Sequence, residues 1–300
     1  MVKDRYPHVG LERICRLFGI TRQAYYKNIK YQKKAITEDH IVLQLISAIR
    51  KDHPRMGGRK IHYMIKQDID RLSIKMGRDA LFDLLASERM LVQRRKRKHI
   101  TTNSNHWYKK YPNLIKGLIP DGPNQIWVSD ITYIRTKQEF IYLFLITDAY
   151  SKKILGFRLA KNLDSIHAVN SLQDAIKNTC QPISGLIHHS DRGIQYCSKE
   201  YTDLLNKHAI SISMTENSDP LENAIAERIN GILKDEYLND KINNQSNLDI
   251  KQVSYAIEKY NRLRPHLSCD MLTPEEAHKC QGNLRRKWKN YYRKSVNLEV

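Results

Sequence analysis

Three strand-like segments follow one another in the middle of this chain, and no helical pattern separates them. Each is rich in apolar, β-branched or aromatic residues, as is typical of buried strands. Helical and strand-like segments then alternate, so the order predicts an α/β domain with a mixed sheet. The expected strands cover residues 125–135, 140–149, 153–160, 185–190 and 209–214, and the expected helices cover residues 165–179, 199–207, 221–238 and 248–262.

Three acidic residues occupy distinct positions in this pattern. Asp130 lies inside an apolar strand, where a carboxylate is costly unless it is paired, hydrogen-bonded or bound to a metal. Asp191 ends the strand 185–190, and strand ends commonly build sites, although an Asp just before Gly193 also fits a turn cap. Glu227 lies within a helical pattern. Sixty residues separate the two aspartates, and thirty-five separate the second aspartate from the glutamate.

The segment that carries Glu227 has an apolar face and a separate polar face. The polar residues are spaced 4, 3 and 4 apart, which places them on one side of a helix. By itself, this pattern is most often a solvent-exposed amphipathic helix. The spacing to the two aspartates instead favours a site. The polar face comprises Asn223, Glu227, Asn230 and Lys234, and the apolar face comprises Ile225, Ile229, Ile232 and Leu233.

Two carboxylates on strands and one on a helix can hold two divalent metal ions over a phosphodiester. Mg²⁺ prefers carboxylate, phosphate and water oxygens, and two Mg²⁺ roughly 4 Å apart stabilise both oxygens of an in-line displacement. In this hypothesis Asp130 bridges the two ions, Asp191 and Glu227 each hold one, and Mn²⁺ can substitute. Lys234, two turns after the glutamate, would contact a DNA phosphate. The predicted chemistry is cleavage and joining of DNA strands.

Neighbouring residues compete for these roles. Thirty residues separate Glu222 from Asp191, and Glu222 lies near the helix start, where acids are favoured as caps. Asp148 ends the second strand and is expected to be structural or peripheral. His188 and His189 either orient substrate or metal-bound water, or are buried structural histidines, and the sequence leaves both alternatives open.

Positive charge is concentrated at the two ends of the chain. The formal net charge of +19 divides into +16 for residues 1–112, −2 for residues 113–280 and +5 for residues 281–300. A charge that only aided solubility would be spread more evenly. The pattern therefore predicts that the basic flanks bind a polyanion and that the chemistry lies in the middle.

Residues 10–30 predict a helix–turn–helix, in which Gly19 makes the turn and Thr21 caps the second helix. The second helix of such a motif enters the major groove of DNA, although an ordinary helical hairpin is an alternative. The expected DNA-contacting residues of this helix are Arg22, Gln23 and Lys27.

Residues 37–99 predict further helices and a possible second helix–turn–helix. A flexible basic turn is expected at residues 54–60. The basic run at residues 94–98 is interpreted as a solvated linker, a phosphate contact, or both. The expected DNA-contacting residues here are Arg59, Lys60, Arg94, Arg95, Lys96, Arg97 and Lys98.

The pattern divides the chain into five parts. Its five cysteines are scattered without paired metal-ligand spacing, which argues against a disulfide framework. No apolar run approaches the roughly 18–20 residues of a membrane span, and no signal-peptide core follows the N-terminus. The parts are a helix–turn–helix-like segment (1–36), a second basic helical DNA-binding region (37–99), a linker (100–123), the catalytic core (124–280) and a basic tail (281–300).

Three ordered motifs, Trp127–Tyr133, His189–Tyr196 and Asn223–Glu227, carry a family resemblance. Together they resemble the catalytic protein (orfB type) of insertion-sequence transposases in the D,D(35)E transposase and retroviral integrase superfamily. Tyr260–His266 and Leu272–Pro274 resemble the end of the family's integrase core, and Gly57–Ile61 resembles part of its helix–turn–helix region. The resemblance covers nearly the whole chain.

The resemblance implies a ribonuclease H-like catalytic core preceded by an all-α helix–turn–helix DNA-binding region. It implies that Asp130, Asp191 and Glu227 are the metal-binding acids and that Lys234 is a basic residue near DNA. The implied activity is Mg²⁺-dependent binding of terminal inverted repeats, cleavage to free 3′-hydroxyls and joining to target DNA. The implied partners are double-stranded DNA, further copies of the chain, and an upstream helix–turn–helix protein of the same element, joined to it by frameshifting. A bacterial, cytoplasmic, nucleoid-associated location is expected.

The chain departs from the family pattern in two places. Residues 217–222 lack the family's frequent Asn-Cys-Tyr-Asp stretch, which keeps Glu222 as a competitor for the third ligand. The basic loop 55–60 lacks the family's frequent aromatic residue. One alternative function is a nuclease of the same fold, for which residues 1–112 would be superfluous. Another is a DNA-binding regulator without catalysis, in which damage to the three acids would be expected.

Overall fold

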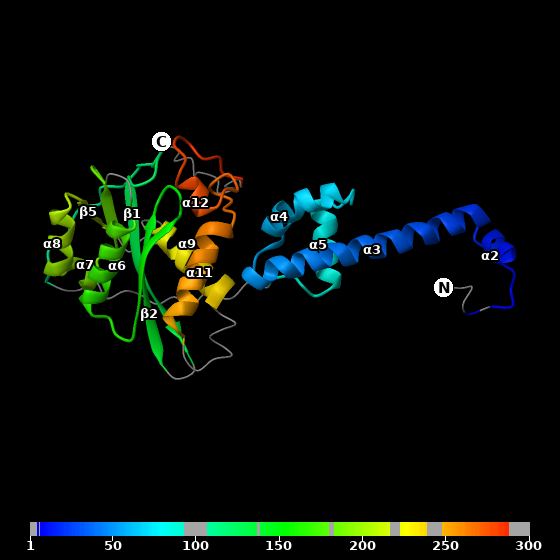
Figure 1. Cartoon of the computed structure of the whole chain (residues 1–300), viewed down its shortest axis with the longest axis horizontal. Helices are drawn as coiled ribbons and strands as arrows, with labels where there is room; N and C mark the ends of the chain where they lie inside the picture. The colour runs from blue at the N-terminus through cyan, green and yellow to red at the C-terminus, as the bar shows by residue number, and fades with distance from the viewer. Residues whose placement is uncertain are drawn as a thin grey trace, which may run out of the picture. The chain divides into compact units, whose positions relative to one another are not determined.

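The computed structural model divides into two compact units, Met1–Arg94 and Arg95–Val300 (Figure 1). None of the described helices is both long and apolar enough to cross a membrane. The four cysteines that the structure describes are free thiols. The structure describes residues 5, 7–92, 107–136, 139–179, 183–216, 223–238 and 248–287.

The N-terminal unit begins with a helix–turn–helix. Gly19, with φ of 64°, makes the turn between α2 (Leu11–Leu17) and α3 (Arg22–Asp52). Thr21 caps α3, because its hydroxyl accepts a hydrogen bond of 3.1 Å from the backbone N–H of Ala24. The predicted turn and cap are therefore confirmed.

Helix α3 is a single helix of 31 residues. The expected division between residues 36 and 37 falls inside it, because the sequence around that point contains neither Gly nor Pro to end a helix. Its buried residues, Val42 and Ile46, lie in the second half and pack with α4 (Gly58–Arg71) and α5 (Arg78–Ser87). The first half of α3 contributes no residue to this core.

The basic turn expected at residues 54–60 is shorter than predicted. Helix α4 begins at Gly58, so Arg59 and Lys60 lie in its first turn. Gly58 permits a close helix contact, because an added Cβ would lie 3.0 Å from the ring of Phe82 in α5. Packing against α5 thus draws the end of the predicted turn into a helix.

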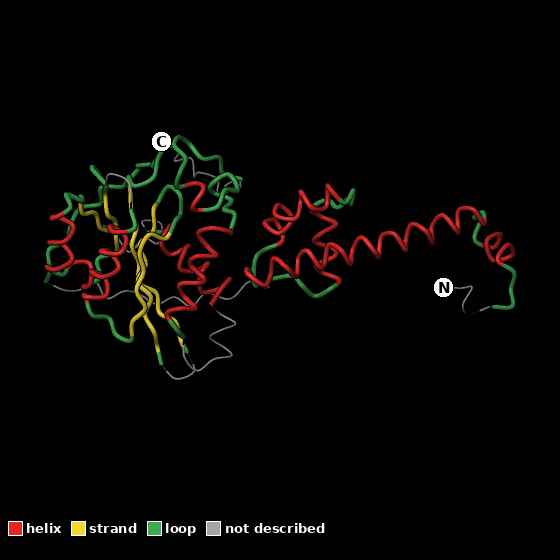
Figure 2. The backbone as a smooth tube through the Cα atoms, viewed as in Figure 1, coloured by secondary structure: helices red, strands yellow, loops and turns green. Residues whose placement is uncertain are grey.

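The second unit contains a five-stranded sheet of order β3-β2-β1-β4-β5 (Figures 1 and 2). The first three strands are antiparallel, and β4 and β5 continue in parallel from β1. The predicted mixed sheet is confirmed, with shorter β4 and β5 than expected. The bounds are β1 (Ile126–Arg135), β2 (Phe140–Asp148), β3 (Ile154–Ala160), β4 (Ile187–Ser190) and β5 (Ser211–Met214).

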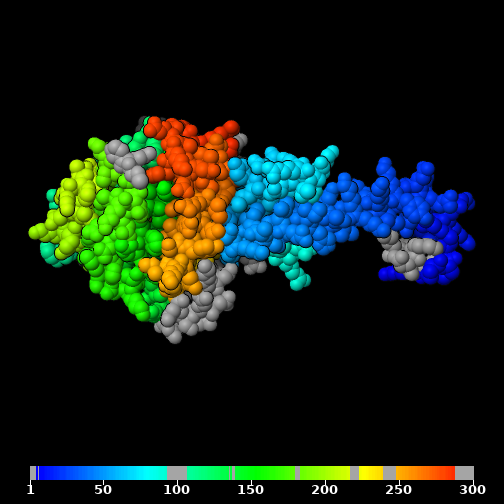
Figure 3. Space-filling view, viewed as in Figure 1, coloured from blue at the N-terminus to red at the C-terminus, as the bar shows by residue number. Residues whose placement is uncertain are grey.

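Helices cover both faces of this sheet. One core joins the sheet to α6 (Ser165–Lys177), α7 (Ile194–Cys197) and α8 (Lys199–Lys207) around buried Trp127. The other core joins it to the helices that follow β5, which lie on the opposite side of the strands in Figure 1. The space-filling view shows α11 in orange as a continuous part of the surface (Figure 3). These helices are α9 (Ala224–Ile232), η1 (Leu233–Leu238) and α11 (Ile250–Leu263), and the short α12 (Pro274–Ala277) comes after them.

The helix expected at residues 221–238 is not uniform. Residues 221 and 222 lie outside the described residues, α9 begins at Ala224, and the last six residues form the π-helix η1. Glu236 of η1 accepts two hydrogen bonds, of 2.7 and 2.8 Å, from the buried guanidinium of Arg264. We infer that this long-range pair helps hold the wider turn, a feature that helical periodicity does not reveal.

Candidate active site

The sheet places Asp130 and Asp191 side by side. Strands β1 and β4 pair in parallel, with Val128 opposite His189. Two residues further along each chain are Asp130 and Asp191. At this point β4 has ended, while β1 continues with Asp130 opposite Leu145 of β2. The two carboxylates therefore start from adjacent positions where β1 and β4 separate.

The polar face of α9 and η1 lies along β1. Three of the four predicted polar residues face β1, which corrects the alternative of a wholly solvent-exposed face, whereas the fourth, Glu227, is exposed. Asn223 and Asn230 are buried, and Lys234 is half-buried. The contacts are Asn223 Nδ2 to the Ser129 carbonyl (3.0 Å), Asn230 Nδ2 to Asp130 Oδ2 (2.6 Å) and Lys234 Nζ to Thr132 Oγ1 (3.0 Å).

The surroundings of Asp130 favour its neutral form. Burial is the largest cause and, with the negative charge of Asp191, raises the pKa of Asp130 to about 7. Glu227 also raises this pKa, whereas hydrogen bonds from Asn230 and from the Ile131 N–H lower it. Asp191 and Glu227 thus each lie within electrostatic range of Asp130.

Glu227 itself lies in the first turn of α9 with its side chain exposed. Among the described residues, no three His, Cys, Asp or Glu side chains converge closely enough to hold a metal ion. The donor set of Asp130, Asp191 and Glu227 nevertheless fits Mg²⁺, because it consists of carboxylate oxygens. A cation would also offset the repulsion that raises the pKa of Asp130. The Glu227 side chain is exposed at the start of α9, so a change in its orientation would not require the buried core to move.

Asp191 also stabilises its own turn. Its Oδ1 accepts a hydrogen bond of 3.0 Å from the Gly193 N–H, just before α7. A Cβ at Gly193 would lie 3.0 Å from the same oxygen, so the turn leaves little room for a larger residue. The turn-capping role predicted as an alternative for Asp191 is present, and it orients the carboxylate beside Asp130.

Lys234 lies beside the acids and against β1. Its ammonium group lies 4.8 Å from the ring centre of Tyr133, in addition to its hydrogen bond with Thr132. Burial lowers the pKa of Lys234, whereas Asp235 and Asp130 raise it. The predicted contact with a DNA phosphate remains a prediction.

His188 and His189 point into the core. His188 Nε2 lies 2.6 Å from Ser129 Oγ and 2.8 Å from the Tyr201 hydroxyl. Burial lowers the pKa of His188 to about 3, so its ring is neutral. His189 Nδ1 lies 2.8 Å from Ser213 Oγ. Of the two alternatives, this burial favours structural histidines.

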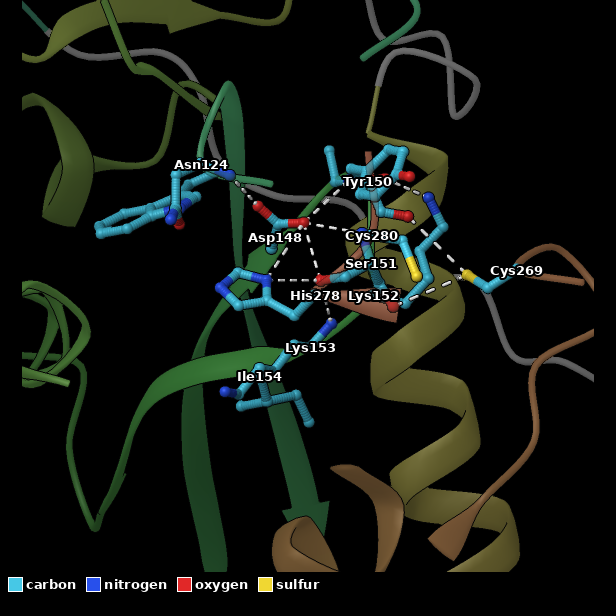
Figure 4. Close-up of polar contacts among 12 residues, drawn as sticks. Asn124, Asp148, Tyr150, Ser151, Lys152, Lys153, Ile154, Cys269, His278 and Cys280 are labelled. Carbon is cyan, nitrogen blue, oxygen red and sulfur yellow. Dashed lines mark hydrogen bonds and ion pairs between the residues drawn. The ribbon is translucent and has the colours of Figure 1, made fainter. Parts of the chain in front are cut away.

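Asp148 is a structural residue, as expected. Its buried carboxylate accepts hydrogen bonds from the backbone N–H groups of Asn124 (2.7 Å), Tyr150 (3.1 Å) and Ser151 (2.7 Å). The Ser151 hydroxyl also donates to it and lies 2.9 Å from His278 Nδ1. Figure 4 shows Asp148 at the centre of these contacts, which fix the turn between β2 and β3. Glu222, which competes with Glu227 for the third ligand position, lies outside the described residues.

The remaining predicted residues that the structure describes are on the N-terminal unit. Arg22, Gln23 and Lys27 are exposed in the first turns of α3, while Arg59 and Lys60 lie in α4. The run Arg94–Lys98 lies outside the described residues. Sequence reasoning did not assign a role to Asn230 as the partner of Asp130. The signal was present in its spacing of three residues from Glu227.

Comparison with protein families matches two models described as "Integrase core domain", over residues 120–220 and 208–274. An insertion element IS600 protein of 31 kDa from Shigella sonnei is 29% identical over 265 residues, which cover 87% of this chain and 96% of the relative. The IS629 transposase of the same species is 26% identical, covering 90% of this chain and 92% of the relative. The IS904 transposase of Lactococcus lactis is 30% identical, covering 59% and 74% respectively.

Solved integrase structures are also similar to this chain. The catalytic core domain of HTLV-2 integrase in complex with magnesium is 23% identical with a TM-score of 0.43, covering 52% of this chain and 97% of that one. A simian T-cell lymphotropic virus intasome in complex with a PP2A regulatory subunit is 21% identical with a TM-score of 0.49, covering 80% of each chain.

Proposed function

This chain belongs to the IS3 family of insertion-sequence transposases, which carry an integrase core domain of ribonuclease H-like fold, and from this membership we propose its reaction. The chain binds the ends of its element, cleaves them to expose 3′-hydroxyls and joins these to target DNA. The observation that carries the proposal is the parallel pairing of β1 and β4, which places Asp130 and Asp191 side by side, with Glu227 near enough to raise the pKa of Asp130.

The proposed metal ligands are these three carboxylates. Asp130, on β1, would hold the Mg²⁺ ions together with Asp191 and Glu227. Bound there, the ions would supply positive charge to the attacking and leaving oxygens of an in-line displacement, and Mn²⁺ is expected to substitute. The HTLV-2 integrase core is described in complex with magnesium, which is a property of that protein. The choice of metal here follows from the carboxylate ligands.

The residues around the acids would orient them. Asn230 and the Ile131 N–H each hold one oxygen of Asp130, which limits rotation of the carboxylate. Lys234, held against Thr132, presents a cation next to the same strand and would contact a phosphate of the bound DNA. This arrangement gives the phosphodiester a fixed orientation, as displacement requires.

Binding of element ends is assigned to the helical N-terminal region. The exposed face with Arg22, Gln23 and Lys27 would enter the major groove, where the charges of Arg22 and Lys27 would also neutralise flanking phosphates. Arg59, Lys60 and the run at residues 94–98 would contact further phosphates. Two element ends must be joined in one complex, so at least two copies of the chain are expected on DNA. An upstream helix–turn–helix protein of the same element, fused by frameshifting, is a further proposed partner.

The test is a strand-joining assay with purified protein, a pre-cleaved element end, plasmid DNA and Mg²⁺. Glu227→Gln should abolish joining, because it removes a charged ligand at nearly constant size, while end binding stays within about twofold. Glu200→Gln, an exposed acid on α8, is the matched control and should join normally. Normal joining by Glu227→Gln, with joining lost in Glu222→Gln, would assign the third ligand to Glu222 instead.

A further inference from the structure

Two stacked aromatic residues stand at the start of the described part of the sheet-containing unit. The rings of Trp107 and Tyr108 lie 4.4 Å apart at 19°. Trp107 is 87% exposed, more than any other large hydrophobic side chain that the structure describes. A tryptophan that is supported on one side and open to solvent on the other is suited to stack on a flat ligand.

The segment that carries this pair is anchored to the core. Tyr108 and Tyr111 pack against the core that contains Trp127. Further along, the Met214 N–H donates to the Pro112 carbonyl at 3.2 Å, and the Leu114 N–H donates to Ser213 Oγ at 2.9 Å. The aromatic pair therefore belongs to a segment that is hydrogen-bonded to the end of β5.

This end of β5 adjoins the candidate active site. The Thr215 N–H donates to the carbonyl of Ser190 at 3.0 Å, and the next residue is Asp191. Cys197 Sγ lies 3.7 Å from Met214 Sδ. Burial raises the pKa of the Cys197 thiol to about 11, while Asp191 raises it and Lys110 lowers it. Lys110 and Asp191 thus both lie within electrostatic range of one thiol.

The segment also carries the charge that a nucleic acid requires. Lys109 and Lys110 are exposed, and Lys109 Nζ lies 5.1 Å from the ring centre of Tyr111. Aromatic residues interleaved with lysines are how proteins bind single strands, because bases stack on the rings while the cations contact phosphates. Inside a duplex both faces of each base are covered, so an indole can stack only on an unpaired or terminal base.

We propose that residues 107–111 form a stacking site for an unpaired base of the DNA strand that enters the active site, with Trp107 against the base and Lys109 and Lys110 on the flanking phosphates. The proposal rests on the proposed function, since it places a processed DNA end next to Asp191. It adds a sequence-tolerant contact that is separate from recognition of the element ends by the helical unit.

The test uses the full chain and two DNA duplexes of the same sequence. One duplex ends in a short unpaired overhang that contains the fluorescent base 2-aminopurine, and the other carries this base at an internal, fully paired position. Trp107→Ala should weaken binding of the overhang duplex about tenfold and abolish quenching of its fluorescence. Binding of the fully paired duplex, whose only open base faces are at its two ends, should weaken far less, and Trp107→Phe should restore most of the quenching. Ile119→Ala, an exposed apolar residue of the neighbouring segment at 76% exposure, is the control and should bind both duplexes normally.

Separate outcomes would overturn this proposal and the proposed function. The stacking site would be refuted if Trp107→Ala weakened binding of both duplexes equally, or if it did not weaken binding of the overhang duplex. A change in oligomeric state of Trp107→Ala without DNA, measured by light scattering, would instead assign the indole to a protein contact. Glu227→Gln should quench the 2-aminopurine fluorescence of the overhang as strongly as the unaltered chain does. If the overhang is quenched but no variant, nor the unaltered chain, joins DNA, the proposed function fails while base stacking stands.

Discussion

Asp130 lies close to two other acids and is also buried, and without a metal ion both conditions disfavour its negative charge. Its position on β1 brings it next to Asp191 and within range of Glu227, and burial adds to the cost of its charge. Asn230 and the Ile131 N–H offset only part of this cost. A group whose folded pKa lies above its ordinary value binds more protons when folded. Stability therefore falls as the pH rises from about 4 to about 7, and it levels off above that range.

This sign leads to a prediction at the residue scale. Without divalent metal, Asp130→Asn should raise the unfolding temperature at pH 8, because the amide removes the unfavourable charge. A gain on the order of 1 kcal/mol corresponds to roughly 2–4 °C for a domain of this size. The gain should disappear near pH 3, which lies below both the folded pKa of about 7 and the ordinary pKa of an Asp, so that Asp130 is largely protonated in both states. Thermal unfolding at both pH values measures it.

Metal provides the complementary measurement. Added Mg²⁺ should raise the unfolding temperature of the unaltered chain and have a smaller effect on Asp130→Asn, because a ligand that binds only the folded state stabilises it. Ser129→Ala is not a suitable control, because it would remove the hydroxyl that contacts His188. Glu200→Gln on α8 serves instead. An equal Mg²⁺ response in Asp130→Asn would count against Asp130 as a ligand.

The acids illustrate which parts of a site are predictable at this scale. A carboxylate inside an apolar strand stands out because such a position normally excludes charge. A carboxylate at a strand end is noticed because strand ends commonly build sites. The spacing of Asn223, Asn230 and Lys234 predicted a shared face. It did not predict that this face packs on β1, since periodicity gives the angle between residues on a helix and not the identity of its neighbour.

At the scale of elements, the buried pair of Arg264 and Glu236 connects the end of α11 to η1. The guanidinium is 1% exposed and makes two hydrogen bonds to the carboxylate. Removing one partner of a buried pair leaves an uncompensated charge, which costs about 3–5 kcal/mol. Because η1 continues the helix of Glu227, this pair also supports the position of the proposed third ligand.

Arg264→Met should therefore destabilise the chain by about 3–5 kcal/mol in urea unfolding, and adding Glu236→Gln should recover part of the loss. The same helix supplies a matched control. Arg262 makes an exposed pair with Glu258 at 2.9 Å, so Arg262→Met should cost about 0–1 kcal/mol. Similar losses from Arg262→Met and Arg264→Met would show that burial of the second pair is not decisive.

Elements were predictable where their pattern is local. The strands at residues 126–135 and 140–148 agree with the expected runs to within one residue at each end, because runs of apolar, β-branched and aromatic residues mark them. The π-helix was not predictable, since one partner of the Arg264–Glu236 pair lies 28 residues away. The sequence did not predict that α3 is undivided. The lack of a helix-breaking Gly or Pro is a weaker signal than the presence of one.

At the scale of the whole chain, charge separates the predicted tasks. Residues 1–112 carry a net +16, while residues 113–280 carry −2. The first half of α3 contributes no buried residue, so its side chains are open to solvent. A helix segment that contributes no buried residue to a core and carries a surplus of lysine is available for a polyanion. Such binding releases counterions and must weaken as salt rises.

The last prediction measures this separation. Affinity for an element-end duplex, plotted as log K against log salt, should have a steep negative slope. Arg22→Gln combined with Lys27→Gln should reduce the slope by about 2, because each phosphate contact contributes about 0.9. The control replaces two exposed lysines of the other unit, Lys177→Gln with Lys207→Gln, and should leave the slope unchanged. If the control pair lowers the slope and the α3 pair does not, the sheet-containing unit, and not the basic helices, captures the DNA.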